Sequence, residues 1–218
     1  MVTAYAAVKL GHKTTVKCRA LNVARAGELS AYVEEVAGSH RYLFALINNA
    51  GVMHPEPILG GGRMDRWRAM MDINYFAPLE GCVAAVAAMR AHGRPAHLIN
   101  ISSIAAGIES MGPYSASKKA LEIMSETLRT ELQRDRIRIT VLVPGVFATN
   151  LGRDLSPEMG ARLIEGARSK GFDLTAGINE QVMGDPQHIA RAVRYILEQP
   201  ASINIERMVV RPPADLSF

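Results

Sequence analysis

Short apolar runs alternate with long amphipathic patterns along this chain, and this alternation constrains the fold more than any other feature. Runs rich in β-branched and apolar residues read as five strands, and helical periodicity of apolar positions separates them. Such an alternation predicts a mostly parallel sheet with helices on both faces, which is a doubly wound α/β fold. The expected strands are 15–23, 42–51, 96–102, 137–145 and 203–212, and the expected helices are 26–38, 65–92, 114–134 and one that begins near Asp185 and Pro186.

Length and composition indicate one soluble globular domain over residues 1–218. The chain is 48% hydrophobic and 21% charged, without a linker, repeat or low-complexity tract. Its apolar runs fall short of the roughly 18 residues that a membrane helix needs. Cys18 and Cys82 give neither a disulfide framework nor a zinc spacing, so we expect a reducing, cytoplasmic location. The dispersed net charge of +4 argues against nucleic-acid binding, and the scattered histidines argue against a metal site.

Small or polar residues stand where the expected strands end. The strand ends carry Asn22-Val23, then Asn48 to Gly51, then Ser102-Ser103, then Pro144-Gly145. In open parallel sheets, ligands bind outside the carboxyl ends of the strands. We therefore expect these residues to converge on one edge of the sheet and to form a binding site there.

Tyr114 and Lys118 begin the helix that follows the Ser102-Ser103 strand, so they belong to the same edge. Positions i and i+4 share a helix face, which lets the phenol and the ammonium meet around one ligand. A free tyrosine has a pKa of about 10, and a neighbouring ammonium stabilises the phenolate. Tyr114 could then exchange a proton with an alcohol or carbonyl oxygen that a nearby serine holds. Taken alone, this spacing more often marks the first turn of an ordinary helix, and only the ordered combination with the strand ends points to an active site.

Five segments, in chain order, resemble successive motifs of the short-chain dehydrogenase/reductase family. The resemblance runs from about residue 15 to the last expected strand. It implies a Rossmann-like fold and an enzyme that uses NAD or NADP to interconvert a small-molecule carbonyl and a secondary alcohol. The segments are LINNAGV (46–52), MMDINYFAP (70–78), LINISSIAAG (98–107), YSASK (114–118) and VLVPGVFAT (141–149).

The resemblance also implies roles for particular residues. Tyr114 matches the family's acid/base, and Lys118 matches the residue that lowers its pKa and holds the nicotinamide ribose. Ser103 matches the residue that binds the substrate oxygen, and Asn74 matches the asparagine that kinks its helix and holds a water in a proton relay. The residues that resemble cofactor contacts are Asn22, Val23, Asn49, Ala50, Gly51, Pro144, Gly145, Phe147 and Thr149, together with Tyr114 and Lys118.

Two departures from the family pattern qualify this picture. The stretch from Ser103 to Tyr114 is a residue or two shorter than usual, so Ser102 is kept as an alternative to Ser103. The family's opening strand, glycine-rich turn, helix and second strand have no counterpart. Residues 1–12 contain one glycine, Gly11, and read as the tail of a helix.

The missing strands would lie between the runs 15–23 and 42–51, and the run 42–51 reads as a strand buried on both faces. A chain that starts here is therefore expected to fold differently from an intact relative, because a buried strand would lose a neighbour. Three explanations are open: an N-terminal segment that this chain does not include, a misassigned start codon, or a truncated chain without activity. We favour the first two over the third.

The resemblance leaves several expectations about partners and function. The helices 65–92 and 114–134 correspond to those that pair between subunits in the family, which implies a homodimer or homotetramer. The stretch 150–184 occupies the position of a substrate lid, with a plain surface helix as the alternative. The basic charge balance favours NADP over NAD. Two other functions stay open: a non-catalytic relative that acts as a binding protein, and an isomerase or dehydratase.

Overall fold

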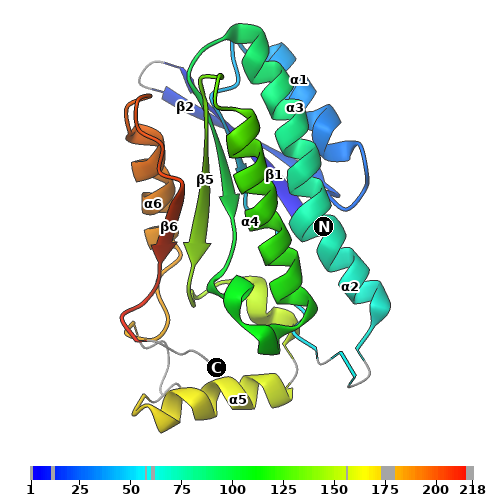
Figure 1. Ribbon diagram of the computed structural model, residues 1–218, viewed down its shortest axis with the longest axis vertical. Helices are drawn as coiled ribbons and strands as arrows, with labels where there is room; N and C mark the ends of the chain where they lie inside the picture. The colour runs from blue at the N-terminus through cyan, green and yellow to red at the C-terminus, as the bar shows by residue number, and fades with distance from the viewer. Residues whose placement is uncertain are drawn as a thin grey trace.

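The computed structural model describes residues 2–10, 13–56, 58–59, 62–155, 157–172 and 180–214. A four-stranded parallel sheet in the order β3-β4-β5-β6 lies at its centre (Figure 1). Strand β4 is buried along its whole length. The four strands are β3 (Ala45–Asn48), β4 (Ala96–Ile101), β5 (Ile137–Pro144) and β6 (Arg207–Val210).

Helices cover both faces of this sheet. Leu98 and Ile139 pack with apolar residues of α1, α3 and α4 on one face. Ile99 and Leu142 pack against Ile196 of α6 on the other face. Successive strand residues point to opposite faces, so β4 and β5 serve both layers, and the predicted doubly wound α/β fold is confirmed. The helices are α1 (Glu28–Ser39), α2 (Met64–Met71), α3 (Ala77–His92), α4 (Pro113–Glu131), α5 (Pro157–Ser169) and α6 (Gln187–Glu198), with a π-helical turn η1 (Asp72–Phe76) and the 3-10 turns η2 (Ile104–Gly107), η3 (Glu109–Met111) and η4 (Asn150–Asp154).

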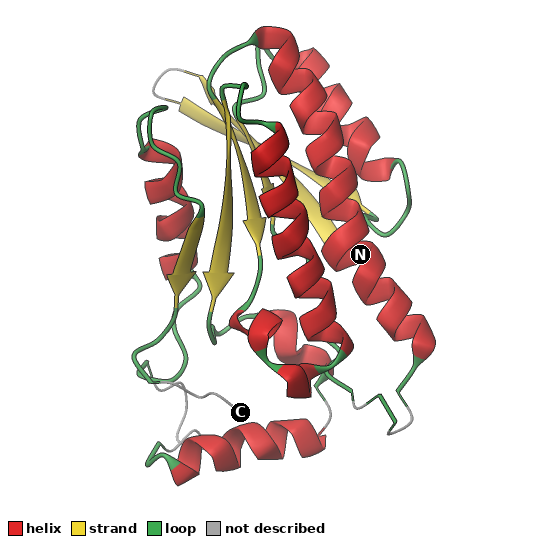
Figure 2. Cartoon of the chain, in the orientation of Figure 1, coloured by secondary structure: helices red, strands yellow, loops and turns green. Residues whose placement is uncertain are grey.

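The N-terminal segment departs from the sequence-based expectation. Strands β1 (Val2–Leu10) and β2 (Lys13–Leu21) form a separate two-stranded antiparallel sheet, one of the two sheets drawn in yellow in Figure 2. The predicted helix tail over residues 1–12 is therefore wrong for 2–10, while residues 1, 11 and 12 lie outside the described part. Because β2 does not join the parallel sheet, its backbone groups need another partner, and β1 provides one along its whole length. The two valines, the threonine and the tyrosine of β1 are residue types that favour strands.

The strand predicted over 42–51 is real but is not buried on both faces. Within the described residues β3 pairs only with β4, so it forms an edge of the parallel sheet. Ile47 lies in register with Ile99, on the face that α6 covers. The α6 helix packs over the strands beyond β3, so Ile47 remains 41% exposed. Phe44, just before β3, is 43% exposed.

The remaining elements follow the predicted pattern, with one interruption. The single helix predicted over 65–92 consists of α2, the π-helical turn and α3. The helix α6 begins one residue later than the sequence suggests, because Pro186 is its N-cap rather than its first helical residue and Asp185 precedes the cap. The Asp185 carboxylate still accepts a hydrogen bond from the Gln187 N–H at 2.8 Å. Among the described residues, no helix is both long enough and apolar enough to cross a membrane.

Candidate active site

Tyr114 and Lys118 lie at the start of α4, and both are buried. Their exposed fractions are 1% and 5%. Gly112 and Pro113 set the direction of the helix, because Gly112 has a φ of +52° that favours glycine, and Pro113 suits the first helical position. A Cβ atom on Gly112 would also lie only 3.2 Å from the Glu56 carbonyl oxygen. The glycine thus lets the loop after β3 approach the helix that carries Tyr114.

Burial acts on both titratable groups. Desolvation lowers the pKa of Lys118 to about 8, since the charged ammonium has lost water. The Lys118 Nζ donates a hydrogen bond to the Ile101 carbonyl oxygen at 2.9 Å, which ties α4 to the end of β4. Burial raises the pKa of Tyr114, and a side-chain hydrogen bond with Ser103 opposes that rise. The phenol is therefore protonated at neutral pH, and the lowering of its pKa by Lys118 that the sequence led us to expect is not found, because burial outweighs the other influences on this group.

The two serines at the end of β4 have different partners. Ser103 has an extended backbone and is the serine that reaches Tyr114. Its Oγ also accepts a hydrogen bond from the Ala105 N–H at 3.1 Å, which fixes the start of η2. Ser102 is buried and donates to the Glu122 carboxylate at 2.8 Å. Of the two candidates, Ser103 is the one beside the phenol.

Asn74 is fully buried inside the π-helical turn between α2 and α3. The Ala77 N–H donates to the Asp72 carbonyl five residues back, and such single π turns recur at functional sites. The Asn74 Oδ1 accepts from the Val52 N–H, and its Nδ2 donates to the Val52 carbonyl, both at 2.9 Å. The Nδ2 also donates to Ser117 Oγ at 3.0 Å. One side chain therefore joins the segment after β3 to α4.

The Asn49 to Gly51 segment runs directly beside this cluster. A Cβ atom at Gly51 would lie 3.3 Å from Asn74 Oδ1 and 3.5 Å from Lys118 Nζ. A side chain at this position would therefore touch the Lys118 ammonium and crowd the Asn74 amide, whereas glycine leaves that space open. Asn74, Ser103, Tyr114, Lys118 and Gly51 are thus gathered at one edge of the parallel sheet.

The turn after β5 lies at the same edge of the sheet. Pro144 ends β5, and the Gly145 N–H donates to the Val210 carbonyl of β6 at 2.8 Å. A Cβ atom at Gly145 would come within 2.4 Å of the Arg211 Cβ, so the two strand ends approach closely. Phe147 forms an isolated bridge with Gly184, and Thr149 Oγ1 accepts from the Leu151 N–H at the start of η4.

Asn22 and Val23 follow β2 and therefore leave the two-stranded sheet, not the parallel one. The Asn22 N–H donates to the Glu28 carboxylate at 2.9 Å, and Asn22 Oδ1 accepts from the Ala24 N–H at 3.2 Å. Val23 is buried in the core beside Leu29. Asn22 and Val23 were expected at the edge of the parallel sheet, but the strand that they follow is not part of that sheet. Their role in cofactor binding stays a prediction from the sequence.

A buried polar chain behind the site was not foreseen from the sequence. Asn48 Nδ2 donates to Asn100 Oδ1 at 2.8 Å, and Asn100 Nδ2 donates to Ser125 Oγ at 2.9 Å. These contacts link β3, β4 and α4. Cys82 lies beside the two asparagines, and burial raises the pKa of its thiol to about 12, so it is no nucleophile. The available signal was an asparagine at an otherwise apolar strand position in both LINN and LINI.

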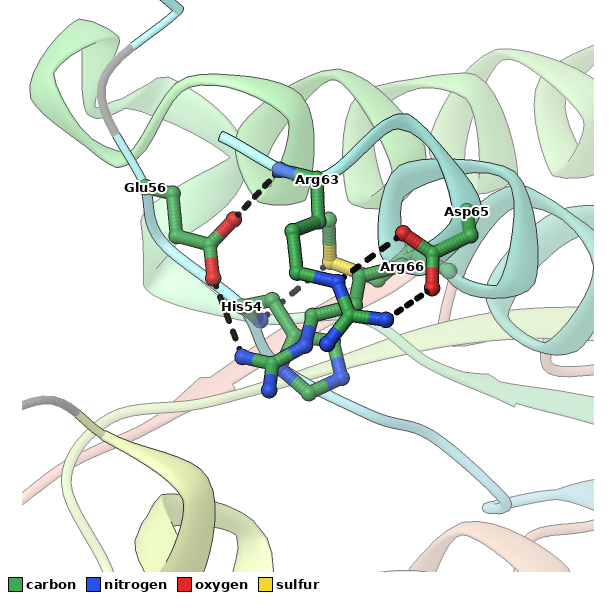
Figure 3. A network of polar contacts seen from close by, with 6 residues as sticks. His54, Glu56, Arg63, Asp65 and Arg66 are labelled. Carbon is green, nitrogen blue, oxygen red and sulfur yellow. Dashed lines mark hydrogen bonds and ion pairs between the residues drawn. The ribbon is translucent and has the colours of Figure 1, made fainter. Parts of the chain in front are cut away.

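A second unforeseen network closes the loop between β3 and α2 (Figure 3). The Glu56 carboxylate accepts from the Arg63 N–H and from the Arg66 guanidinium, each at 3.1 Å. The His54 N–H donates to the Met70 sulfur, and Met70 packs in the same apolar cluster as Tyr114. The loop that borders Tyr114 is thereby attached to α2. Within the described part of the chain, no cluster of three or more histidine, cysteine, aspartate or glutamate residues could hold a metal ion.

Comparison with known proteins assigns the chain to a family. A family model described as short chain dehydrogenase matches residues 2–160. The chain belongs to this family. An uncharacterized oxidoreductase of Staphylococcus saprophyticus is 29% identical to this short-chain dehydrogenase over 210 residues, which cover 94% of this chain and 78% of the relative. Dehydrogenase/reductase SDR family member 11 of Gallus gallus is 30% identical over 202 residues, 87% of this chain and 72% of the relative.

Solved structures agree on the fold. A metagenomic short-chain oxidoreductase in complex with NADP superposes with a TM-score of 0.66 at 24% identity, over 90% of this chain and 74% of that one. An alcohol dehydrogenase from Thermococcus sibiricus, complexed with 5-hydroxy-NADP, gives a TM-score of 0.70 at 19% identity, over 87% and 72%. The Rossmann-like arrangement of this oxidoreductase family is thus present here.

Proposed function

We propose that this short-chain dehydrogenase transfers hydride between a nicotinamide cofactor and a small carbonyl or secondary-alcohol substrate, with Tyr114 as general acid and base. The observation that carries the proposal is the group at the carboxyl end of β4 formed by the buried Tyr114 and Lys118 and the partly buried Ser103. A phenol, a hydroxyl and an ammonium in that arrangement match the needs of proton transfer to an oxygen atom that is being reduced.

In the direction of reduction, Tyr114 donates its proton to the substrate oxygen while Ser103 holds that oxygen. The raised pKa of Tyr114 keeps the proton on the phenol until it is needed. In the direction of oxidation, Tyr114 must first lose its proton. The Lys118 ammonium, one helical turn away, then stabilises the phenolate, and its pKa of about 8 leaves it mainly protonated at neutral pH. The nicotinamide, when bound, supplies or accepts the hydride.

The residues around Lys118 fit a nicotinamide cofactor. Lys118 carries three N–H donors, and the described residues engage one of them with the Ile101 carbonyl. The bare Cα of Gly51 leaves room for sugar hydroxyls to reach the others. We therefore assign the ribose to Lys118 and Tyr114, and the remaining cofactor contacts to Asn49, Ala50, Gly51, Pro144, Gly145, Phe147 and Thr149.

NADP is proposed over NAD. Support comes from the NADP complexes of the metagenomic oxidoreductase and of gluconate 5-dehydrogenase from Burkholderia cenocepacia, whose structure also holds tartrate. The net charge of +4 points in the same direction.

We also propose that the chain forms a homo-oligomer through α3 and α4. A groove of about 640 Å³ runs between these helices and is lined largely by apolar side chains. Val83 and Ile123 border it and are 60% and 50% exposed. Apolar surface of this kind is expected to be covered by a partner, here a second copy of the chain.

The stretch 150–184 is proposed as a substrate lid within a single domain. Its helix α5 lies beyond the arrowheads of β5 and β6 in Figure 1, on the side of the carboxyl ends. Ala167 of α5 packs on Val182, which attaches one end of the helix to the segment that bridges to Phe147. Residues 156 and 173–179 of the predicted lid lie outside the described residues.

Transfer of deuterium tests the proposed reaction. The purified protein is incubated with NADPH that carries deuterium at both hydrogen positions of nicotinamide C4, so that the label is transferred whichever face reacts. A set of aldehydes and ketones is supplied, and the products are analysed by mass spectrometry. We expect an alcohol whose carbinol carbon carries one deuterium. Cofactor oxidation without label in any alcohol would contradict direct hydride transfer.

A further inference from the structure

Glu122 of α4 has a buried carboxylate that the proposed reaction does not use. Its exposed fraction is 6%, although it lies on a helix whose neighbouring position, Ile123, is half exposed. The Glu122 Oε1 accepts the hydrogen bond from Ser102 Oγ at 2.8 Å. A buried carboxylate is costly unless it is well paired, so this position is expected to serve a purpose.

The two cations beside Glu122 only partly stabilise its buried carboxylate. Lys119 Nζ lies 3.5 Å and Arg207 Nη2 lies 3.8 Å from the carboxylate oxygens. Both cationic side chains are more than half exposed, at 56% and 54%, and ion pairs of that kind contribute little. The short, fully buried bond to Ser102 is the specific contact.

This bond belongs to a series that joins three consecutive residues of the β4 end to α4. Asn100 donates to Ser125, the Ile101 carbonyl accepts from Lys118, and Ser102 donates to Glu122. The last two helix residues are one turn apart, on the same face as Tyr114. The sheet ladder ends at Ser102, whose N–H donates to the Leu142 carbonyl of β5. Ser103 is the next residue, and its hydroxyl is the group that reaches Tyr114.

We propose that Glu122 is a positioning residue for Ser103. By accepting the hydrogen bond from the Ser102 hydroxyl, Glu122 fixes the position of α4 relative to the end of β4. This in turn sets where the Ser103 hydroxyl lies against Tyr114. The inference rests on the proposed function only for its effect on turnover. The placement of Ser103 against Tyr114 can be measured without any reaction.

The first test observes Tyr114 directly by nuclear magnetic resonance. The protein has six tyrosines, so a sample labelled with 13C at the tyrosine Cζ gives six resolvable carbons, and the Tyr114→Phe variant identifies the one of interest. Because Cζ responds to hydrogen bonding of the phenol, Ser103→Ala should shift this signal. Ser102→Ala and Glu122→Ala should shift it in the same direction by at least half as much.

Two variants serve as controls. Glu122→Gln keeps an oxygen that can accept the Ser102 hydrogen bond and should leave the Tyr114 signal at the wild-type position. Glu126→Ala removes an exposed acid one turn further along α4 and should also leave it there. Ser102→Ala makes the smallest change, so it keeps the test decisive if Glu122→Ala does not fold. An unmoved Tyr114 signal in folded Ser102→Ala and Glu122→Ala protein would overturn the proposal.

The second test uses turnover of NADPH with the most reactive carbonyl compound of the deuterium experiment. A displacement of about 1 Å in a catalytic group costs on the order of 100-fold. We expect Glu122→Ala to lower kcat about 10- to 100-fold, with KM for NADPH within about threefold and with Glu122→Gln restoring most of the rate. In a Ser103→Ala background, Glu122→Ala should cost less than about threefold, because the group that it positions is gone.

A loss that is equal in both backgrounds would instead assign Glu122 a purely structural role. Failure of the proposed function has a different signature. In that case Tyr114→Phe would retain turnover whatever the resonance experiment shows.

Discussion

Replacement of Asn74 by leucine should destabilise the fold markedly, although the two side chains are similar in size. The Asn74 side chain pairs with both backbone groups of Val52 and with Ser117 Oγ. Leucine would leave the Val52 N–H and carbonyl without these partners, at a place where the side chain of residue 74 is fully buried. An unmade hydrogen bond of a buried group costs about 1–3 kcal/mol, and Val52 is only partly buried, so we expect about 2–4 kcal/mol in total.

The assay for this prediction is thermal unfolding followed by circular dichroism. For a chain of this length, each kcal/mol lowers Tm by roughly 2–4 °C, so Asn74→Leu should unfold about 4–16 °C below the wild type. Asn74→Asp can still accept from the Val52 N–H but cannot donate, and it should lie in between. Asn204→Ala, at an exposed position, is the control and should leave Tm unchanged. An Asn74→Leu Tm within about 2 °C of the wild type would show that Val52 does not depend on this side chain.

Two further predictions concern the surroundings of Lys118. Gly51→Ala should weaken NADPH binding at least about tenfold in a fluorescence titration, because its Cβ would lie 3.5 Å from Lys118 Nζ, while Tm changes little; unchanged affinity would place the ribose elsewhere. The pKa of Lys118 is lowered to about 8 in the folded protein, against 10.5 in the unfolded chain. Between pH 8 and pH 10.5 the unfolded chain therefore binds more protons than the folded protein. The free energy of unfolding consequently rises as pH rises through this range. In urea unfolding of cofactor-free protein, the free energy of unfolding should therefore rise by up to about 3 kcal/mol more in the wild type than in Lys118→Met between pH 8 and 10.5. If the free energies of unfolding of the two proteins changed in parallel with pH, the burial of the Lys118 ammonium would be contradicted.

The central and C-terminal elements could be predicted from the sequence because their patterns are long and periodic. The β4 run is apolar and bounded by polar residues, and α4 has a clear apolar stripe, so both were located to within a few residues. The gathering of Tyr114, Lys118 and Ser103 followed from the rule that parallel strands present their carboxyl ends at one edge.

The N-terminal hairpin could not be predicted in the same way. Whether residues 2–10 form a helix or a strand depends on what β2 pairs with, and that is a long-range property of the sheet. The π turn at Asn74 was also hidden, because one extra residue in a turn hardly disturbs the apolar periodicity of a long helix.

Glu122 was missed for a related reason. A single acidic residue in an amphipathic helix reads as part of the solvated face. Its main contact is Ser102 at the end of β4, which precedes it by a whole loop and the start of α4, and Arg207 of β6 also lies near it from much later in the chain. Local periodicity carries no information about such contacts.

The measurement that tests the account most directly compares Tyr114→Phe with the wild type in two assays on the same samples: NADPH binding by fluorescence and steady-state reduction of a carbonyl compound. We predict that Tyr114→Phe lowers kcat at least about 1,000-fold, because the proton donor is lost. Tm should stay within a few degrees of the wild type. NADPH affinity should fall by no more than about threefold, because Lys118 and the other proposed cofactor contacts remain when the Tyr114 hydroxyl is removed. Turnover within tenfold of the wild type would contradict the assignment of Tyr114 as the acid and base of this enzyme.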